Sequence, residues 1–173
     1  MLSVLSLKES QKWDEIVMSF KDYDIYYLSG YAKACKVIED GEPTLFFYED
    51  HNVRLINVVF IRDIAKCEYF KQKLPENTYY DMTTPYGYGG FLIEGLLEDD
   101  SFQKINEKYE SYCKKNNIIS EFIRFHPLLN NHSEFNAIYN VALNRDTIYI
   151  NLENEELIWD NMKSTSRHRI RKI

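Results

Sequence analysis

Residues 44–61 read TLFFYEDHNVRLINVVFI, and this stretch decides the fold. Two apolar runs, 44–48 and 55–61, are rich in aromatic and β-branched side chains, and the turn-forming triplet Asp50-His51-Asn52 separates them. The pattern predicts a β-hairpin whose second strand is buried.

The segments on either side of this hairpin alternate between helical and extended patterns. Apolar residues at helical spacing predict helices over 8–20, 28–37 and 99–116, and Asn154 is a candidate cap for a last helix. Further strands are expected at 91–93, 119–125, 141–143 and 147–152. This order of elements predicts an α/β (α+β) fold, a single domain with a mixed central sheet flanked by helices.

Composition excludes several classes of protein. The 173 residues are 45% hydrophobic, which suits one ordinary domain, and no apolar run is long enough for a transmembrane helix. Three cysteines, odd in number and without a CxxC pair, indicate reduced thiols in a cytoplasmic protein. No sequence pattern for a metal site is present, so none is predicted.

Charge is distributed unevenly. The net charge is −6, but residues 163–173 carry five basic side chains and no acid, so residues 1–162 sum to −11. The acidic body argues against general coating of nucleic acid. The basic end is either an exposed helix end or a surface that meets an anion.

The first candidate ligand site is the stretch 79–90, which reads YYDMTTPYGYGG. Gly87 and Gly89 let the backbone approach a ligand closely, while Thr84, Tyr86 and Tyr88 offer hydroxyl groups. The stretch matches neither a Walker loop nor GxGxxG. Two interpretations stay open, a ligand-binding loop and a tight turn filled by aromatic rings.

The second candidate is Arg124, which lies in an otherwise apolar predicted strand. An unpaired buried guanidinium is unfavourable, so Arg124 needs an anion, either a carboxylate of the protein or a ligand phosphate. We favour the internal partner slightly, and Asp81 is a candidate for it. His126 ends this strand and is a candidate base, although a lone histidine there is more often structural. No nucleophile–base pattern is visible, so the catalytic residues are unknown.

Four segments in order resemble Fem-type acyltransferases of the GNAT superfamily: DIYYLSGYAK at 24–33, DMTTPYGYGG at 81–90, FIRFHPL at 122–128, and the basic run from Leu152 to Lys172. The resemblance implies a GNAT-like domain over 1–153. It also implies that 154–173 is a basic helix leading toward a second GNAT-like half, absent from this chain.

That resemblance implies transfer of an acetyl or aminoacyl group to an amine, for which a peptidoglycan precursor is one candidate acceptor. The donor, acyl-CoA or aminoacyl-tRNA, would bind the missing half, so this half would hold no cofactor and be incomplete as a catalyst on its own. Transfer RNA would be the one nucleic-acid partner.

The same resemblance implies an acceptor-side site. Lys33 would contact the diphosphate of a nucleotide-linked acceptor, and the loop with Thr84 and Tyr86 would shape the pocket. The basic residues lining the same cleft would be Arg167, Arg169, Arg171 and Lys172. Two alternatives stay open: a non-catalytic domain that binds a nucleotide-sugar or phosphate, and a structural half that associates with a second half or with itself.

Overall fold

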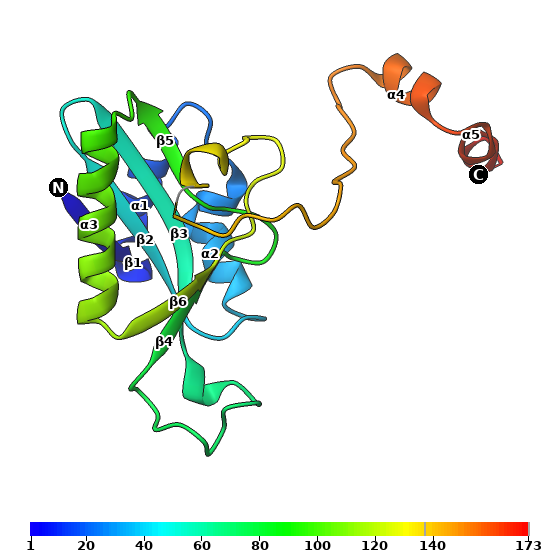
Figure 1. Ribbon diagram of the computed structural model, residues 1–173. Helices are drawn as coiled ribbons and strands as arrows, with labels where there is room; N and C mark the ends of the chain where they lie inside the picture. Colours follow the sequence, from blue (N-terminus) through cyan, green and yellow to red (C-terminus); the bar gives the residue numbers. More distant parts are fainter. Residues whose placement is uncertain (137, 173) are drawn as a thin grey trace. The chain divides into compact units, whose positions relative to one another are not determined.

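The computed structural model of the chain describes residues 1–136 and 138–172 (Figure 1). The chain divides into two units, Met1–Val141 and Ala142–Ile173, and each is described by itself. No helix in the described ranges is long and apolar enough to cross a membrane.

The first unit is built on the expected hairpin, β2 (Glu42–Glu49) and β3 (Val53–Asp63), which pair antiparallel. On the outer edge of β2 lies β1 (Leu2–Ser6). The free edge of β3 pairs with two short strands, β5 near its start and β4 near its end. The sheet therefore has six strands: five lie in the order β1-β2-β3-β4-β6, and β5 pairs with β3 outside this order. The remaining bounds are β4 (Tyr80–Thr83), β5 (Leu92–Gly95) and β6 (Ile118–Phe122).

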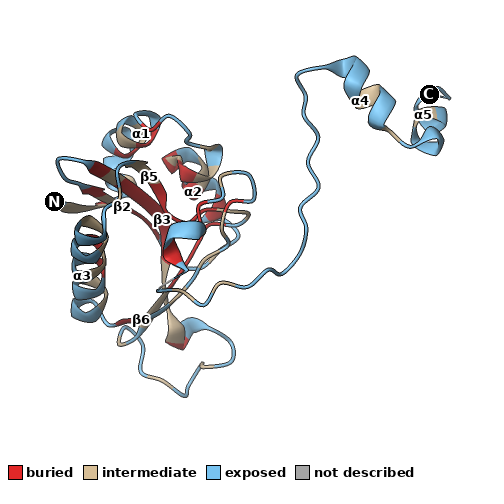
Figure 2. Cartoon of the chain, turned by 45° about the horizontal axis from the view of Figure 1, so that its top comes forward, coloured by how far each residue is buried: buried red, intermediate tan, exposed pale blue. Residues whose placement is uncertain are grey.

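Helices cover both faces of this sheet. The long helix α3 (Asp99–Lys115) lies on one face, and α1 (Ser10–Met18) and α2 (Ser29–Cys35) lie on the other (Figures 1 and 2). Successive side chains of a strand point to opposite faces, so β2 feeds two cores. Phe46 packs toward α3 beside Tyr109, whereas Leu45 joins Trp13 of α1. The prediction of a mixed sheet flanked by helices is confirmed.

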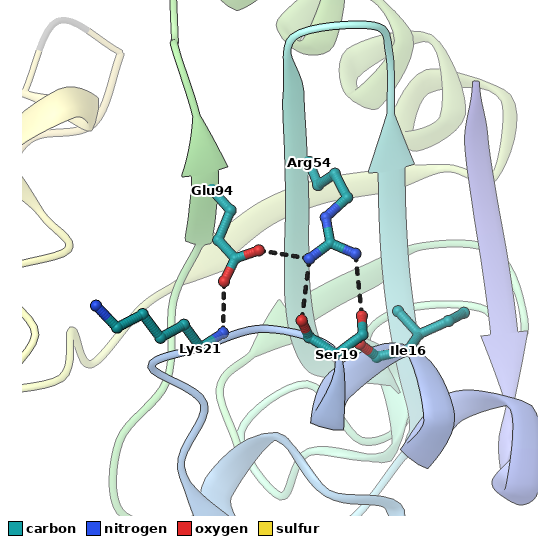
Figure 3. Close-up of polar contacts among 5 residues, drawn as sticks. All are labelled: Ile16, Ser19, Lys21, Arg54 and Glu94. Carbon is teal, nitrogen blue, oxygen red and sulfur yellow. Dashed lines mark hydrogen bonds and ion pairs between the residues drawn. The ribbon is translucent and has the colours of Figure 1, made fainter.

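A polar clasp ties β3, β5 and the end of α1 together (Figure 3). Arg54 on β3 pairs with Glu94 on β5, and its guanidinium also donates to the hydroxyl and carbonyl oxygens of Ser19, at 3.0 and 3.1 Å. Glu94 accepts a further hydrogen bond from the backbone N–H of Lys21. Every group in the clasp is thus occupied by another part of the protein, and its role is structural.

The element predictions differ from the structure at strands β1, β4 and β6 of the first unit. Strands β1 and β4 were not expected, because their residues lack a long apolar run. The predicted strand 119–125 begins within one residue of β6 but extends too far, since β6 covers Ile118–Phe122. The prediction that it is buried is wrong, because Ile119 and Phe122 are mostly exposed. Its register shifts against β4 between Tyr80 and Asp81, which breaks the expected alternation.

The second unit contains two short helices, α4 (Glu155–Asn161) and α5 (Ser164–Ile170). Asn154 caps α4 as expected, accepting the N–H of Leu157 at 3.1 Å. The strands predicted at 141–143 and 147–152 do not form in the described ranges. A strand needs a partner edge for its backbone hydrogen bonds, and no strand pairs with either segment there. The expected single helix is interrupted at Met162-Lys163. The domain boundary at 153/154 stays a prediction.

Candidate functional site

The parallel strands β4 and β6 end side by side, and their loops are bonded together there. Thr84, which is fully buried, accepts the backbone N–H of Arg124 at 3.2 Å, and the N–H of Gly89 donates to the carbonyl oxygen of Arg124 at 2.9 Å. In open α/β sheets, ligands bind outside the carboxyl ends of the strands. A ligand site is therefore expected at this edge of the sheet.

Four aromatic rings meet at this edge, from three separate segments of the chain. We call Tyr26, Tyr31, Tyr88 and His126 the tyrosine–histidine cluster. The ring of Tyr26 makes edge-to-face contacts with the other three, with centroid distances of 5.1 Å to Tyr31, 5.7 Å to Tyr88 and 5.8 Å to His126. Such edge-to-face packing of rings is favourable.

The carboxylate of Asp24 borders the cluster at Tyr26 and His126, and the charge of Glu39 helps to raise the pKa of the Tyr31 hydroxyl. The Oδ2 atom of Asp24 lies 3.4 Å from Nε2 of His126, and Oδ1 of Asp24 accepts the backbone N–H of Tyr26 at 3.4 Å. The Asp24 side chain is 37% exposed, whereas that of His126 is 5% exposed. Burial and the charge of Asp24 both raise the pKa of the Tyr26 hydroxyl, so this phenol stays protonated at neutral pH.

The loop after β4 approaches the cluster closely because two of its glycines take positive φ angles. Gly87 has φ +96°, and a Cβ there would lie 2.5 Å from the Tyr26 ring. Gly90 has φ +90°, and a Cβ would lie 2.8 Å from the Phe125 ring. Only glycine fits both positions, and the groups close to them are aromatic rings of the protein itself. The arrangement therefore agrees with the interpretation of a tight turn filled by aromatic rings, and close approach of a ligand stays a prediction.

Arg124 is not held as expected. Asp81 instead accepts two hydrogen bonds from Arg62, at 2.9 and 2.6 Å, so the predicted Arg124–Asp81 pair is wrong. The physical reason is that β6 ends at Phe122, which leaves Arg124 exposed. Its guanidinium lies over the Phe122 ring at 5.6 Å, and its charge and that of Arg62 oppose the rise that burial causes in the pKa of Glu39.

The other predicted site residues divide between the two units. Tyr86 is exposed, and its carbonyl oxygen accepts the Tyr31 hydroxyl at 2.8 Å, so the loop and α2 are joined here. Lys33 is exposed on α2. In the second unit, Arg167 donates to the carbonyl oxygens of Trp159 and Asp160, and Arg171 lies over the Trp159 ring. A binding role for these residues, and for Arg169, stays a prediction.

Sequence reasoning missed Asp24, Tyr26 and Tyr31 as members of a site and left His126 undecided. The one available signal was the excess of tyrosine, fourteen in 173 residues. No periodicity brings residues 24–31 next to 88 and 126, because their proximity depends on how α2 packs on the sheet.

A second polar cluster, the Glu121 cluster, lies on the α3 face and consists of Asn57, Tyr109, Glu121 and Tyr139. The Glu121 carboxylate accepts hydrogen bonds from Asn57 and Tyr109, both at 3.0 Å, and from the Tyr139 hydroxyl at 2.6 Å. Burial raises the pKa of Glu121, and the three donors act against that rise. Within residues 1–136 and 138–172, no group of three His, Cys, Asp or Glu side chains is placed to hold a metal ion.

Comparison with known proteins finds one curated relative. Over 155 residues the chain is 26% identical to the polyamine aminopropyltransferase of Saccharolobus solfataricus. The aligned region covers 83% of this chain and 51% of the relative. The chain thus spans about half the length of the curated relative that it matches. No family model and no solved structure matches it.

This match overturns the resemblance to Fem-type acyltransferases. The similar protein carries the name of an enzyme that transfers aminopropyl groups, so acyl transfer, the peptidoglycan acceptor and the two non-catalytic alternatives are withdrawn. The four segments misled because each is short and built from tyrosine, glycine and basic residues, which turns and helix ends select in many folds. The expectation about acyl donors rested on that resemblance and stays untested.

Proposed function

We propose that this chain binds an aliphatic polyamine at the tyrosine–histidine cluster, as the amine-binding part of an aminopropyl-transferring protein in the cytoplasm. The observation that carries the proposal is the Asp24 carboxylate beside Tyr26 and His126. The curated relative is named for polyamines and aminopropyl transfer, which supports the ligand class. The proposal for this chain is amine binding, since the chain matches half of that relative.

The chemistry of the cluster suits an alkylammonium group. Aromatic faces attract cations, and an exposed carboxylate supplies the opposite charge. In the described part of the chain no lysine or arginine forms an ion pair with Asp24, and its contacts are the His126 ring and one backbone N–H. The Asp24 charge is therefore available to a ligand, while Arg62 and Asp81 neutralise each other.

Long-range charge favours the same ligand. The first unit, residues 1–141, holds 22 acidic and 15 basic side chains, a net charge of −7. An acidic domain raises the local concentration of a cationic ligand, and salt weakens this effect. The three cysteines are free thiols, which supports the cytoplasmic location.

Calorimetric titration with 1,4-diaminobutane tests the proposal, with 1-butanol and MgCl₂ as probes that share only the alkyl chain or only the charge. We expect saturable 1:1 binding of the diamine alone, and a loss of at least about tenfold in affinity for Asp24→Asn. Glu68→Gln, an exposed acid on another part of the surface, is the matched control. Equal binding by the wild type and Asp24→Asn contradicts the proposal.

A further inference from the structure

Asn131 connects the three segments that build the tyrosine–histidine cluster. It lies in the loop after β6 and is 8% exposed. Its Oδ1 accepts the backbone N–H of His126 at 3.0 Å. Its Nδ2 lies 2.9 Å from the carbonyl oxygen of Gly89 and 3.3 Å from the hydroxyl of Tyr27. One amide thus reaches the immediate neighbours of Tyr26 and Tyr88 and the backbone of His126 itself.

We infer that Asn131 is the positioning residue of the amine site. It holds the rings of Tyr26, Tyr88 and His126 in place relative to one another without touching the ligand. This inference rests on the proposed function. It assigns a role to a buried amide that neither the relative nor the sequence pattern singled out.

The orientation of the amide follows from its partners. On one side stand two carbonyl oxygens, those of Gly89 and Phe91 at 2.9 and 3.1 Å, which accept only from a donor. On the other side stands the N–H of His126, which requires an acceptor. Rotating the amide would place oxygen against oxygen and N–H against N–H, so a single orientation satisfies the site.

The variant Asn131→Asp removes the hydrogen-bond donor of this side chain and keeps the acceptor. An aspartate still accepts the N–H of His126, but its second oxygen faces the two carbonyl oxygens of Gly89 and Phe91. Protonation at low pH returns one O–H donor to that side. The titratable groups in contact with position 131 are Tyr27 and, through its backbone, His126, and Asp24 lies beside His126.

The affinity for 1,4-diaminobutane is measured for wild type, Asn131→Asp and Asn131→Ala between pH 5 and pH 7.5. At pH 7.5 we expect both variants to bind at least tenfold more weakly than the wild type. The ratio of the Asn131→Asp Kd to the wild-type Kd shrinks toward pH 5, whereas the ratio for Asn131→Ala stays constant. Tyr139→Phe, which weakens the opposite face of the sheet, is the control for general destabilisation and keeps wild-type affinity.

Hydrogen exchange of the ligand-free proteins provides the second readout. We expect residues 86–91 to exchange faster in both Asn131 variants than in Tyr139→Phe. Wild-type affinity in folded Asn131 variants, or unchanged exchange at 86–91, overturns the inference while leaving the amine site in place. If the wild type binds no diamine, the proposed function fails, and the exchange rates alone then decide whether Asn131 organises this edge.

Discussion

The Asp24 site and the Glu121 cluster each place one carboxylate among tyrosines, on opposite sides of the same sheet. Glu121 accepts three hydrogen bonds from side chains of β3, α3 and the segment after β6. Asp24 has one backbone donor and a histidine contact, both at 3.4 Å. The difference indicates that a carboxylate whose acceptor capacity is filled by the protein is structural, whereas one with capacity to spare can serve a ligand.

The largest expected effect comes from removing the carboxylate of the Glu121 cluster. Glu121→Ala leaves Asn57, Tyr109 and Tyr139 without their acceptor, so we expect a loss of about 3–5 kcal/mol in the free energy of unfolding. Urea denaturation measures it. Diamine affinity is expected to stay at the wild-type value under folding conditions. A loss below about 1 kcal/mol would show that the cluster is not the structural member of the pair.

The second effect is expected at the ligand side. Asp24→Asn keeps an oxygen to cap the turn at Tyr26 but removes the charge, so stability changes by less than about 1 kcal/mol. Diamine binding weakens by about tenfold or more, equivalent to about 1.4 kcal/mol. Calorimetry and urea denaturation of the same samples separate the two quantities. A variant that loses stability but not affinity would reverse the assignment of roles.

The Arg54–Glu94 clasp extends the comparison, because its side chains are bonded to other parts of the protein, as in the Glu121 cluster, but are partly exposed. Glu94→Gln removes the charge from a pair whose side chains are about 29% and 28% exposed. We expect a loss of about 1 kcal/mol, smaller in high salt. Thermal unfolding in low and high salt measures it. A loss in stability as large as that of Glu121→Ala would mean that the contribution of these clusters to the free energy of unfolding does not follow how deeply they are buried.

The smallest expected effect is a pH dependence of the Glu121 cluster. Burial raises the pKa of Glu121 above its unfolded value, so its contribution to stability is full below the unfolded pKa and is lost as pH rises through the folded pKa. The difference in unfolding free energy between wild type and Glu121→Gln should therefore fall as pH rises from the acidic range toward neutrality. A difference that grows with pH would show that the three donors outweigh burial.

Much of the first unit could be predicted because its signals are local. Two apolar runs and a turn indicate the hairpin of β2 and β3, and an amphipathic pattern indicates the 17-residue helix α3. Strand β4 escaped prediction because its four residues carry no long pattern and gain their conformation from β3 and β6 on either side. The reverse holds for 147–152, where a strand-like alternation finds no partner among the described residues.

For the candidate site, the sequence alone predicted the glycine loop and the neighbourhood of Arg124, because glycines in a turn and a charge within an apolar run are local patterns. It did not determine the surroundings of Arg124 or the position of Asp24 beside His126. Those depend on where β6 ends and on the packing of α2, which bring residues 24–31, 84–90 and 124–131 to one edge of the sheet. Backbone propensity acts over a few residues, whereas hydrogen bonds and ring contacts join segments about a hundred residues apart, so only the tertiary structure could assemble the site.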